Sequence, residues 1–187
     1  MRLKFITTSL PDIILIEPAV FTDHRGFFME TFHHNKYTEA GIIFNFVQDN
    51  RSHSIQGALR GLHYQLKHSQ AKLIYVISGE IFDVAVDIRL GSPTFGQWAG
   101  AVLSEKNNHQ IYIPKGFAHG FCVLSESADI IYKCSELYTP GDEYGILWSD
   151  PDINIKWPAT DPILSDKDKQ NPCLKDVNKE FLPIYTL

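Results

Sequence analysis

The chain has 187 residues, a length that fits one domain built around one hydrophobic core. Hydrophobic residues make up 44% of the chain and charged residues 21%, which favours a packed globular protein over a disordered one. The formal net charge of -5 argues against duplex nucleic acid as a partner, since proteins that bind it carry a clustered basic face. We therefore expect a single domain over residues 1–187 with no nucleic-acid partner.

Cysteine content and the first residues bear on the cellular compartment. The chain has three cysteines, Cys122, Cys134 and Cys173, and no two of them form a CxxC pair. An odd number of widely spaced cysteines favours reduced thiols, which predicts a cytoplasmic protein. The N-terminal residues lack the apolar core and small-residue cleavage site of a secretory signal. No stretch approaches the ~20 apolar residues that a membrane helix needs, so we expect no membrane partner.

Short runs of β-branched and aromatic residues dominate the chain, and turn-forming residues separate them. Many short strands at close spacing are typical of a sandwich or barrel. The expected strands are Ile13–Ile16, Gly26–Phe32, Phe44–Gln48, Ala58–Leu66, Phe95–Leu103, His109–Pro114, Gly120–Leu124 and Asp129–Glu136.

Two further strand-like runs lie in the middle of the chain, separated by the turn signal Ser78-Gly79. The run 72–77 is β-branched and aromatic, and 81–88 alternates apolar residues with Asp83 and Asp87. We interpret the two runs as a hairpin, with one face of the second strand apolar and the other acidic.

Helical signals are few. Asn35 is a candidate cap for a turn over Lys36–Ala40 that Gly41 ends, and Ser165 is a candidate cap for a turn that begins at Asp166. The sequence therefore predicts an all-β fold with a few short flanking helices.

Two segments together indicate a binding cup. Gly57 is followed after five residues by His63, and residues 114–119 read PxGxxH and end at His119. These are the paired motifs of cupins, which are small jelly-roll barrels. Metal-binding cupins have HxH in the first motif, whereas Gln65 stands at the second histidine position here. Because neutral amides are poor ligands for transition metals, we expect no metal site.

A broader resemblance covers nearly the whole chain. The segments that carry it are 21–30 (FTDHRGFFME), 48–50 (QDN), 59–65 (LRGLHYQ), 83–89 (DVAVDIR), 92–96 (SPTFG), 113–121 (IPKGFAHGF), 132–134 (YKC), 143–146 (EYGI) and 164–168 (LSDKD). In order and spacing they resemble the dTDP-4-dehydrorhamnose 3,5-epimerase family. The resemblance implies a cupin-type jelly roll and conversion of dTDP-4-keto-6-deoxy-D-glucose to dTDP-4-keto-L-rhamnose. That isomerisation removes and returns protons at C3 and C5 and needs no cofactor.

The same resemblance implies roles for individual residues. His63 matches the base, and Asp168 matches the carboxylate that holds its imidazole. Lys72 matches the cation that faces the ketone oxygen, and Tyr132 matches the acid on the opposite face. Asp83 matches a residue that supports the site without touching the substrate.

Further positions match the family's contacts with its small-molecule dTDP-sugar. The resemblance implies substrate binding by Arg25, Glu30, Gln48, Asp49, Asn50, Arg60, His119, Tyr138, Glu143 and Lys167. Guanidinium groups suit phosphate oxygens, and a tyrosine ring suits a nucleobase. In the family the N-terminal Arg/Glu segment reaches the neighbouring subunit's ligand, which implies a homodimer.

Three alternatives remain open from the sequence. A single-position epimerase, acting at C3 or C5 of a related dTDP-4-ketohexose, can keep the same base and acid. A metal-dependent cupin oxygenase has Gln65 against it, and stoichiometric iron in the purified protein would favour it. A catalytically silent sugar-nucleotide binding module would be expected to have lost the base or the acid, whereas both are present.

Overall fold

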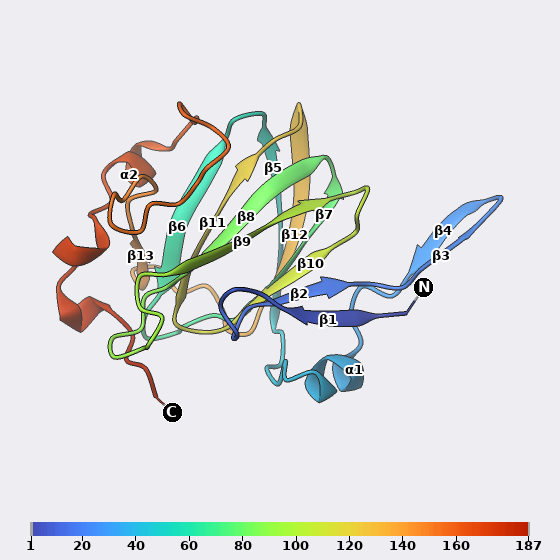
Figure 1. The fold of residues 1–187 in the computed structure, drawn as a ribbon, viewed down its shortest axis with the longest axis horizontal. Helices are drawn as coiled ribbons and strands as arrows, with labels where there is room; N and C mark the ends of the chain where they lie inside the picture. Colours follow the sequence, from blue (N-terminus) through green and yellow to red (C-terminus); the bar gives the residue numbers. More distant parts are fainter. Residues whose placement is uncertain (1, 187) are drawn as a thin grey trace.

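The protein, described here over residues 2–186 of a computed structural model, is built from two antiparallel sheets that face each other (Figure 1). The six-stranded sheet has the order β1 (Lys4–Thr7), β2 (Ile14–Glu17), β10 (Gln110–Ile113), β7 (Lys72–Ser78), β12 (Ser127–Cys134) and β5 (Gln48–Ile55). The five-stranded sheet has the order β13 (Glu143–Gly145), β6 (Leu59–Gln65), β11 (Phe117–Val123), β8 (Glu80–Asp87) and β9 (Trp98–Ser104). The expected all-β jelly-roll fold is confirmed.

A third, two-stranded sheet extends away from the barrel, on the right of Figure 1. It pairs β3 (Val20–Asp23) with β4 (Gly26–Met29). The helical elements are α1 (His34–Glu39), α2 (Asp166–Lys169) and the 3₁₀ turns η1 (Leu174–Asp176) and η2 (Lys179–Phe181). No helix among residues 2–186 combines the length and apolar content needed to cross a bilayer.

Three apolar clusters hold these layers together. The first lies between the two sheets and joins residues such as Ile74 and Ile130 to Ile81 and Phe121. The second packs the C-terminal segment, including Leu182, on the outer face of the five-stranded sheet. The third packs the α1 region on the outer face of the six-stranded sheet. Because both faces of both sheets are covered, several strands are apolar on both sides.

The predicted hairpin over residues 72–88 is wrong. β7 pairs with β10 and β12, whereas β8 pairs with β11 and β9, so the turn at Ser78-Gly79 carries the chain from one sheet to the other. Gly79 has φ +82°, and a Cβ there would stand 2.1 Å from the Ser127 carbonyl oxygen. The predicted division of the faces of β8 is correct, because Phe82, Val84 and Val86 pack in one cluster, and the face that carries Asp83 and Asp87 is fully buried.

Several predicted boundaries differ from the structure. The segment 44–47 is not a strand, and the polar run that follows forms β5 instead, because alternate side chains of that strand face a cavity. The strand predicted over Gly26–Phe32 ends at Met29. Helix α1 begins at His34 with His33 at its N-cap, so Asn35 is not the cap. Ser165 does cap α2, as predicted.

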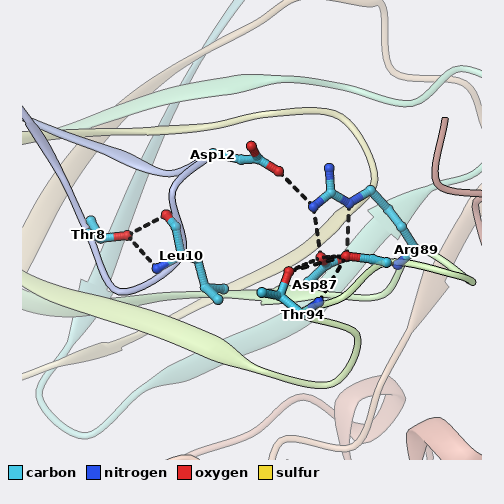
Figure 2. Close-up of polar contacts among 7 residues, drawn as sticks. Thr8, Leu10, Asp12, Asp87, Arg89 and Thr94 are labelled. Carbon is cyan, nitrogen blue, oxygen red and sulfur yellow. Dashed lines mark hydrogen bonds and ion pairs between the residues drawn. The ribbon is translucent and has the colours of Figure 1, made fainter. Parts of the chain in front are cut away.

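A buried polar network fixes the end of β8 (Figure 2). The Asp87 carboxylate accepts hydrogen bonds from Arg89 Nε (2.9 Å) and Nη2 (2.7 Å), and from the Ser92 and Thr94 hydroxyls (2.5 and 2.6 Å). Arg89 Nη2 also donates to Asp12, 2.7 Å away. The guanidinium lies over the Phe117 ring, 4.4 Å from its centroid. Every oxygen of the buried Asp87 carboxylate is therefore compensated.

Candidate active site

A cavity of about 770 Å³ opens between the two sheets. Most of the side chains predicted to form a site line it: His63, Lys72, Tyr132, Asp168, Gln48, Asn50, Arg60, His119, Tyr138, Glu143 and Lys167. The volume is in the range of pockets that enclose small organic ligands.

His63 and Asp168 are in direct contact in the cavity. Strand β6 carries His63 and helix α2 carries Asp168, and the His63 Nε2 to Asp168 Oδ1 distance is 2.5 Å. The other carboxylate oxygen accepts from the Gly61 backbone N–H at 3.4 Å. Ser165 Oγ accepts from the Asp168 backbone N–H at 3.1 Å, so the helix cap also holds the backbone of Asp168 in place.

The ionisation of Asp168 decides which ring nitrogen of His63 is basic. Burial raises the pKa of Asp168, but hydrogen bonds from His63, Gly61 and the Ser165 cap outweigh burial and hold that pKa below its ordinary value. The carboxylate is therefore ionised at neutral pH and can only accept hydrogen bonds. Nε2 of His63 must then carry a proton, which leaves Nδ1 free to act as a base.

A second histidine lies on the neighbouring strand. His119 on β11 is the register partner of His63 on β6. Its Nε2 lies 2.9 Å from Asp83 Oδ2, and Asp83 is fully buried behind it. Asp83 Oδ1 is buried and has no hydrogen-bond partner among residues 2–186. Asp83 therefore supports the wall of the cavity without lining it.

Lys72 and Tyr132 come from the opposite wall, on β7 and β12 of the six-stranded sheet. Burial lowers the pKa of the Lys72 ammonium, while Cys134, Asp83 and Glu143 act in the opposite sense. Burial also raises the pKa of the Tyr132 phenol. The cavity thus places an imidazole on one sheet and an ammonium and a phenol on the other.

Strand β5 supplies polar groups to the cavity at every second residue. Gln48 Nε2 donates to Asn50 Oδ1 (3.0 Å), and Gln48 Oε1 accepts from the Tyr138 backbone N–H (2.9 Å). Arg60 Nε donates to Ser54 Oγ at 2.9 Å, which leaves the terminal nitrogens of the guanidinium available for an anion. At the mouth, Lys167 forms an ion pair with Glu143.

Three predicted binding residues lie outside this cavity in the single chain. Arg25 sits in the turn between β3 and β4 and pairs with Asp23. Glu30 pairs with Lys36 near α1. Asp49 points to the other face of β5, where it pairs with Lys133.

Other cavity residues were missed from the sequence. They are Ser52, His53, Ser54, Ile55, Ala58, Leu59, Gln70, Phe121, Ile163, Leu164 and Ser165. For the two inward-facing serines, the two-residue period along β5 was the available signal, because it places them on the same face as Gln48 and Asn50.

The residues present do not fit a cupin metal centre. Gln65 uses its amide in the fold, since Nε2 donates to the His68 carbonyl (2.8 Å) and Oε1 accepts from the Thr139 N–H (2.8 Å). Between residues 2 and 186, no cluster of three or more His, Cys, Asp or Glu side chains has the arrangement needed to hold a metal ion.

Comparison with known proteins identifies close relatives. Residues 7–176 match the family model described as dTDP-4-dehydrorhamnose 3,5-epimerase. The protein of that name from Shigella flexneri is 55% identical over 168 residues, which cover 89% of this chain and 93% of the relative. The relative of that name from Neisseria gonorrhoeae is also 55% identical, and the chain spans about half of its length (51%).

Solved structures agree with the sequence relatives. The dTDP-6-deoxy-D-glucose-3,5-epimerase from Legionella pneumophila Philadelphia 1, in complex with dTDP-4-keto-L-rhamnose, has a TM-score of 0.97 and 50% identity over 100% of both chains. A 3'-monoepimerase from Streptomyces bikiniensis, in complex with dTDP-quinovose, has a TM-score of 0.90 and 36% identity and covers 96% of this chain and 92% of its own.

Proposed function

This chain belongs to the dTDP-4-dehydrorhamnose 3,5-epimerase family and is an isomerase of that family, and we propose that it works by acid–base chemistry across the cavity between its two sheets. Its substrate is a dTDP-linked 4-keto-6-deoxyhexose. The observation that carries the proposal is the 2.5 Å contact of His63 with a buried, ionised Asp168, opposite a wall that holds Lys72 and Tyr132.

In the first step, His63 Nδ1 removes the proton from the carbon next to the C4 ketone. The electron pair of the C–H bond moves into the carbonyl, which becomes an enolate oxygen. The Lys72 ammonium stabilises the negative charge that develops on this oxygen. Asp168 stabilises the imidazolium that results.

In the second step, the Tyr132 phenol gives its proton to the same carbon from the opposite face, and the ketone is restored. The configuration is inverted because base and acid lie on different sheets. His63 is then protonated and Tyr132 ionised, so protons must return before the second carbon is inverted. Arg60 favours the phenolate, since its charge acts to lower the pKa of Tyr132 against the effect of burial.

Substitution of His63 tests the base. The H63A variant should lose deuterium exchange at both C3 and C5 in deuterated water, because no other group of this wall is assigned to remove the proton. Its affinity for dTDP should stay close to that of the wild type, since the residues assigned to dTDP binding, such as Arg60 and Lys167, are left intact. Undiminished exchange by H63A would remove His63 from the mechanism.

A single-position epimerase is the second candidate. The Streptomyces bikiniensis neighbour, a 3'-monoepimerase, shares the fold at 36% identity. NMR of the sugar after incubation in deuterated water separates the two functions. Deuterium at both C3 and C5 supports the 3,5-epimerase, and deuterium at only one carbon supports the monoepimerase.

We also propose that the protein is a homodimer in which the β3–β4 hairpin completes the partner's cavity. The β3–β4 hairpin extends away from the barrel (Figure 1) and exposes Phe27 and Phe28 (62% and 71%). Its turn carries Arg25, which does not line the cavity of its own chain. Mixed R25A and H63A proteins test this, because a mixed dimer contains one site with both residues intact. Mixing should restore activity that neither variant has alone, and no restoration would contradict the shared site.

A cytoplasmic location is part of the same proposal. Cys122, Cys134 and Cys173 are all free thiols, which suits a reducing compartment.

A further inference from the structure

We propose that Gly145 and Asn171 are positioning residues for the proton-abstracting pair, because together they seat the segment that carries Asp168 against the strand that carries His63. The inference deepens the proposed function and rests on it, since it assumes that Asp168 acts through His63.

Gly145 lies directly beside the base in the sheet. Strand β13 is antiparallel to β6, and Gly145 is the register partner of His63. The next residue locks the pairing, because Ile146 N–H donates to the Leu62 carbonyl (2.9 Å) and Leu62 N–H donates to the Ile146 carbonyl (3.3 Å). The position of β13 is therefore fixed relative to the imidazole.

The Asn171 amide occupies the space that a side chain at position 145 would need. A Cβ on Gly145 would stand 2.3 Å from Asn171 Nδ2 and 2.4 Å from both Cγ and Oδ1, well inside van der Waals contact. The φ angle of Gly145 lies outside the left-handed region, so the backbone does not demand glycine. The space beside Gly145 is filled by the Asn171 amide, so a larger side chain there requires the amide to turn or its segment to move.

Asn171 is connected to Asp168 by a short, restrained path. Helix α2 begins at its Ser165 cap, and the Gln170 N–H donates to the Lys167 carbonyl (3.1 Å) just before Asn171. Pro172 then accepts from the Leu147 N–H at 2.8 Å. If a side chain at position 145 pushes the backbone of Asn171 rather than turning its amide, the turn that holds Asp168 moves with it, and the 2.5 Å contact with His63 changes.

Packing, rather than hydrogen bonding, holds the Asn171 amide. Its Nδ2 is buried and has no hydrogen-bond partner within the described part of the chain. Replacing Asn171 with alanine therefore removes the packed group without breaking a hydrogen bond of that nitrogen. The two positions form a steric pair whose members can be changed separately and together.

A double-mutant cycle tests the pair, with the rate of substrate C–H exchange and the Kd for dTDP as readouts. We expect G145A to lower kcat at least about tenfold and N171A to lower it about threefold, since small misplacements of catalytic groups are costly. In G145A/N171A the added methyl occupies the vacated space, so kcat should rise at least about fivefold above that of G145A. The Kd for dTDP should change much less than kcat, because, of the residues assigned to its binding, only Glu143 and Lys167 lie on the elements that the pair joins.

The D168N background separates positioning from general destabilisation. If the pair acts through Asp168, neither G145A nor N171A should lower kcat further once that carboxylate is gone. G100A is the matched control. Gly100 lies on β9 and does not line the cavity, and a Cβ there would stand 2.7 Å from the Phe82 ring of β8. It should lower the melting temperature and leave kcat unchanged.

Three results would overturn the inference. G145A could be fully active, or the losses of kcat in G145A and N171A could simply multiply in the double mutant. The two substitutions could also lower kcat as much in the D168N background as in the wild type. If G145A does not fold, N171A with and without D168N decides in the same way. A fully active D168N would instead overturn the role proposed for Asp168 itself.

Discussion

Replacement of Asp87 with asparagine should destabilise the protein without touching the cavity. Asp87 is fully buried and accepts four side-chain hydrogen bonds, two of them from the Arg89 guanidinium (Figure 2). Breaking a buried ion pair by removing one partner costs about 3–5 kcal/mol. In D87N the Arg89 guanidinium would keep only its ion pair with the half-exposed Asp12. Each kcal/mol shifts the melting temperature of a domain of this size by about 2–4 °C. D87N should therefore melt about 6–20 °C below the wild type.

D12N is the control for the same arginine. Asp12 also accepts from Arg89, but its side chain is 48% exposed, so its loss should cost about 0–1 kcal/mol. Calorimetry of the three proteins at neutral pH makes the comparison. Equal melting temperatures for D87N and the wild type, or equal losses in D87N and D12N, would refute the reasoning from burial.

The pH dependence gives a second readout for D87N. Burial raises the pKa of Asp87, but hydrogen bonds from Arg89, Ser92 and Thr94 outweigh burial and hold that pKa below its ordinary value. In the unfolded chain the pKa of an aspartate is about 3.9. The stability that ionised Asp87 contributes is therefore fully present above that pH, and it is lost as the pH falls through the lower pKa of the folded state. The difference in free energy of unfolding between wild type and D87N should be constant above about pH 5 and shrink below about pH 4.

The remaining predictions concern the cavity. K72M should lower kcat by about 10²–10³-fold with little change in the Kd for dTDP, since loss of one group that stabilises an oxyanion costs this much. If calorimetry showed weaker dTDP binding while kcat stayed unchanged, Lys72 would not be the group that stabilises the enolate oxygen. Y132F should still exchange the substrate proton on the His63 side but fail to invert the carbon, and full inversion seen by NMR would refute its assignment as the acid. S165A should lose about 1 kcal/mol of stability with its helix cap. Because that cap holds Asp168, S165A should also lower kcat, and an unchanged kcat would show that the cap is not needed for catalysis.

Much of the fold followed from local sequence patterns. Strands β10 and β12 were predicted to within a few residues because their runs of apolar residues end at clear turn signals. The helix at Ser165 was predicted from its cap, since the serine hydroxyl in fact accepts from the N–H three residues on. Local chemistry was sufficient where neighbours in the sequence make the decisive contacts.

The pairing of strands was not available from such patterns. β7 and β8 are adjacent in sequence and separated by a glycine turn, yet each bonds to strands far away in the chain. A period of two shows which residues share a face, and it does not show which strand lies alongside. The polar strand β5 was placed wrongly for a related reason, because its inward side chains face a cavity and not the core.

The site was predicted by resemblance rather than by residue pattern. Asp168 lies 105 residues from His63 in the sequence, and alone it reads as an ordinary acid at the start of a helix. The seat made by Gly145 and Asn171 had no sequence signal, since it depends on how closely two distant segments approach.

The docking of residues 165–182 on the five-stranded sheet ties the base to a segment that lies outside the barrel. Leu174 and Leu182 belong to the apolar cluster on the outer face of that sheet, and Asp168, which contacts His63, lies on the same segment. Local opening of this segment would therefore withdraw the carboxylate from His63 even where the strands of both sheets stay paired.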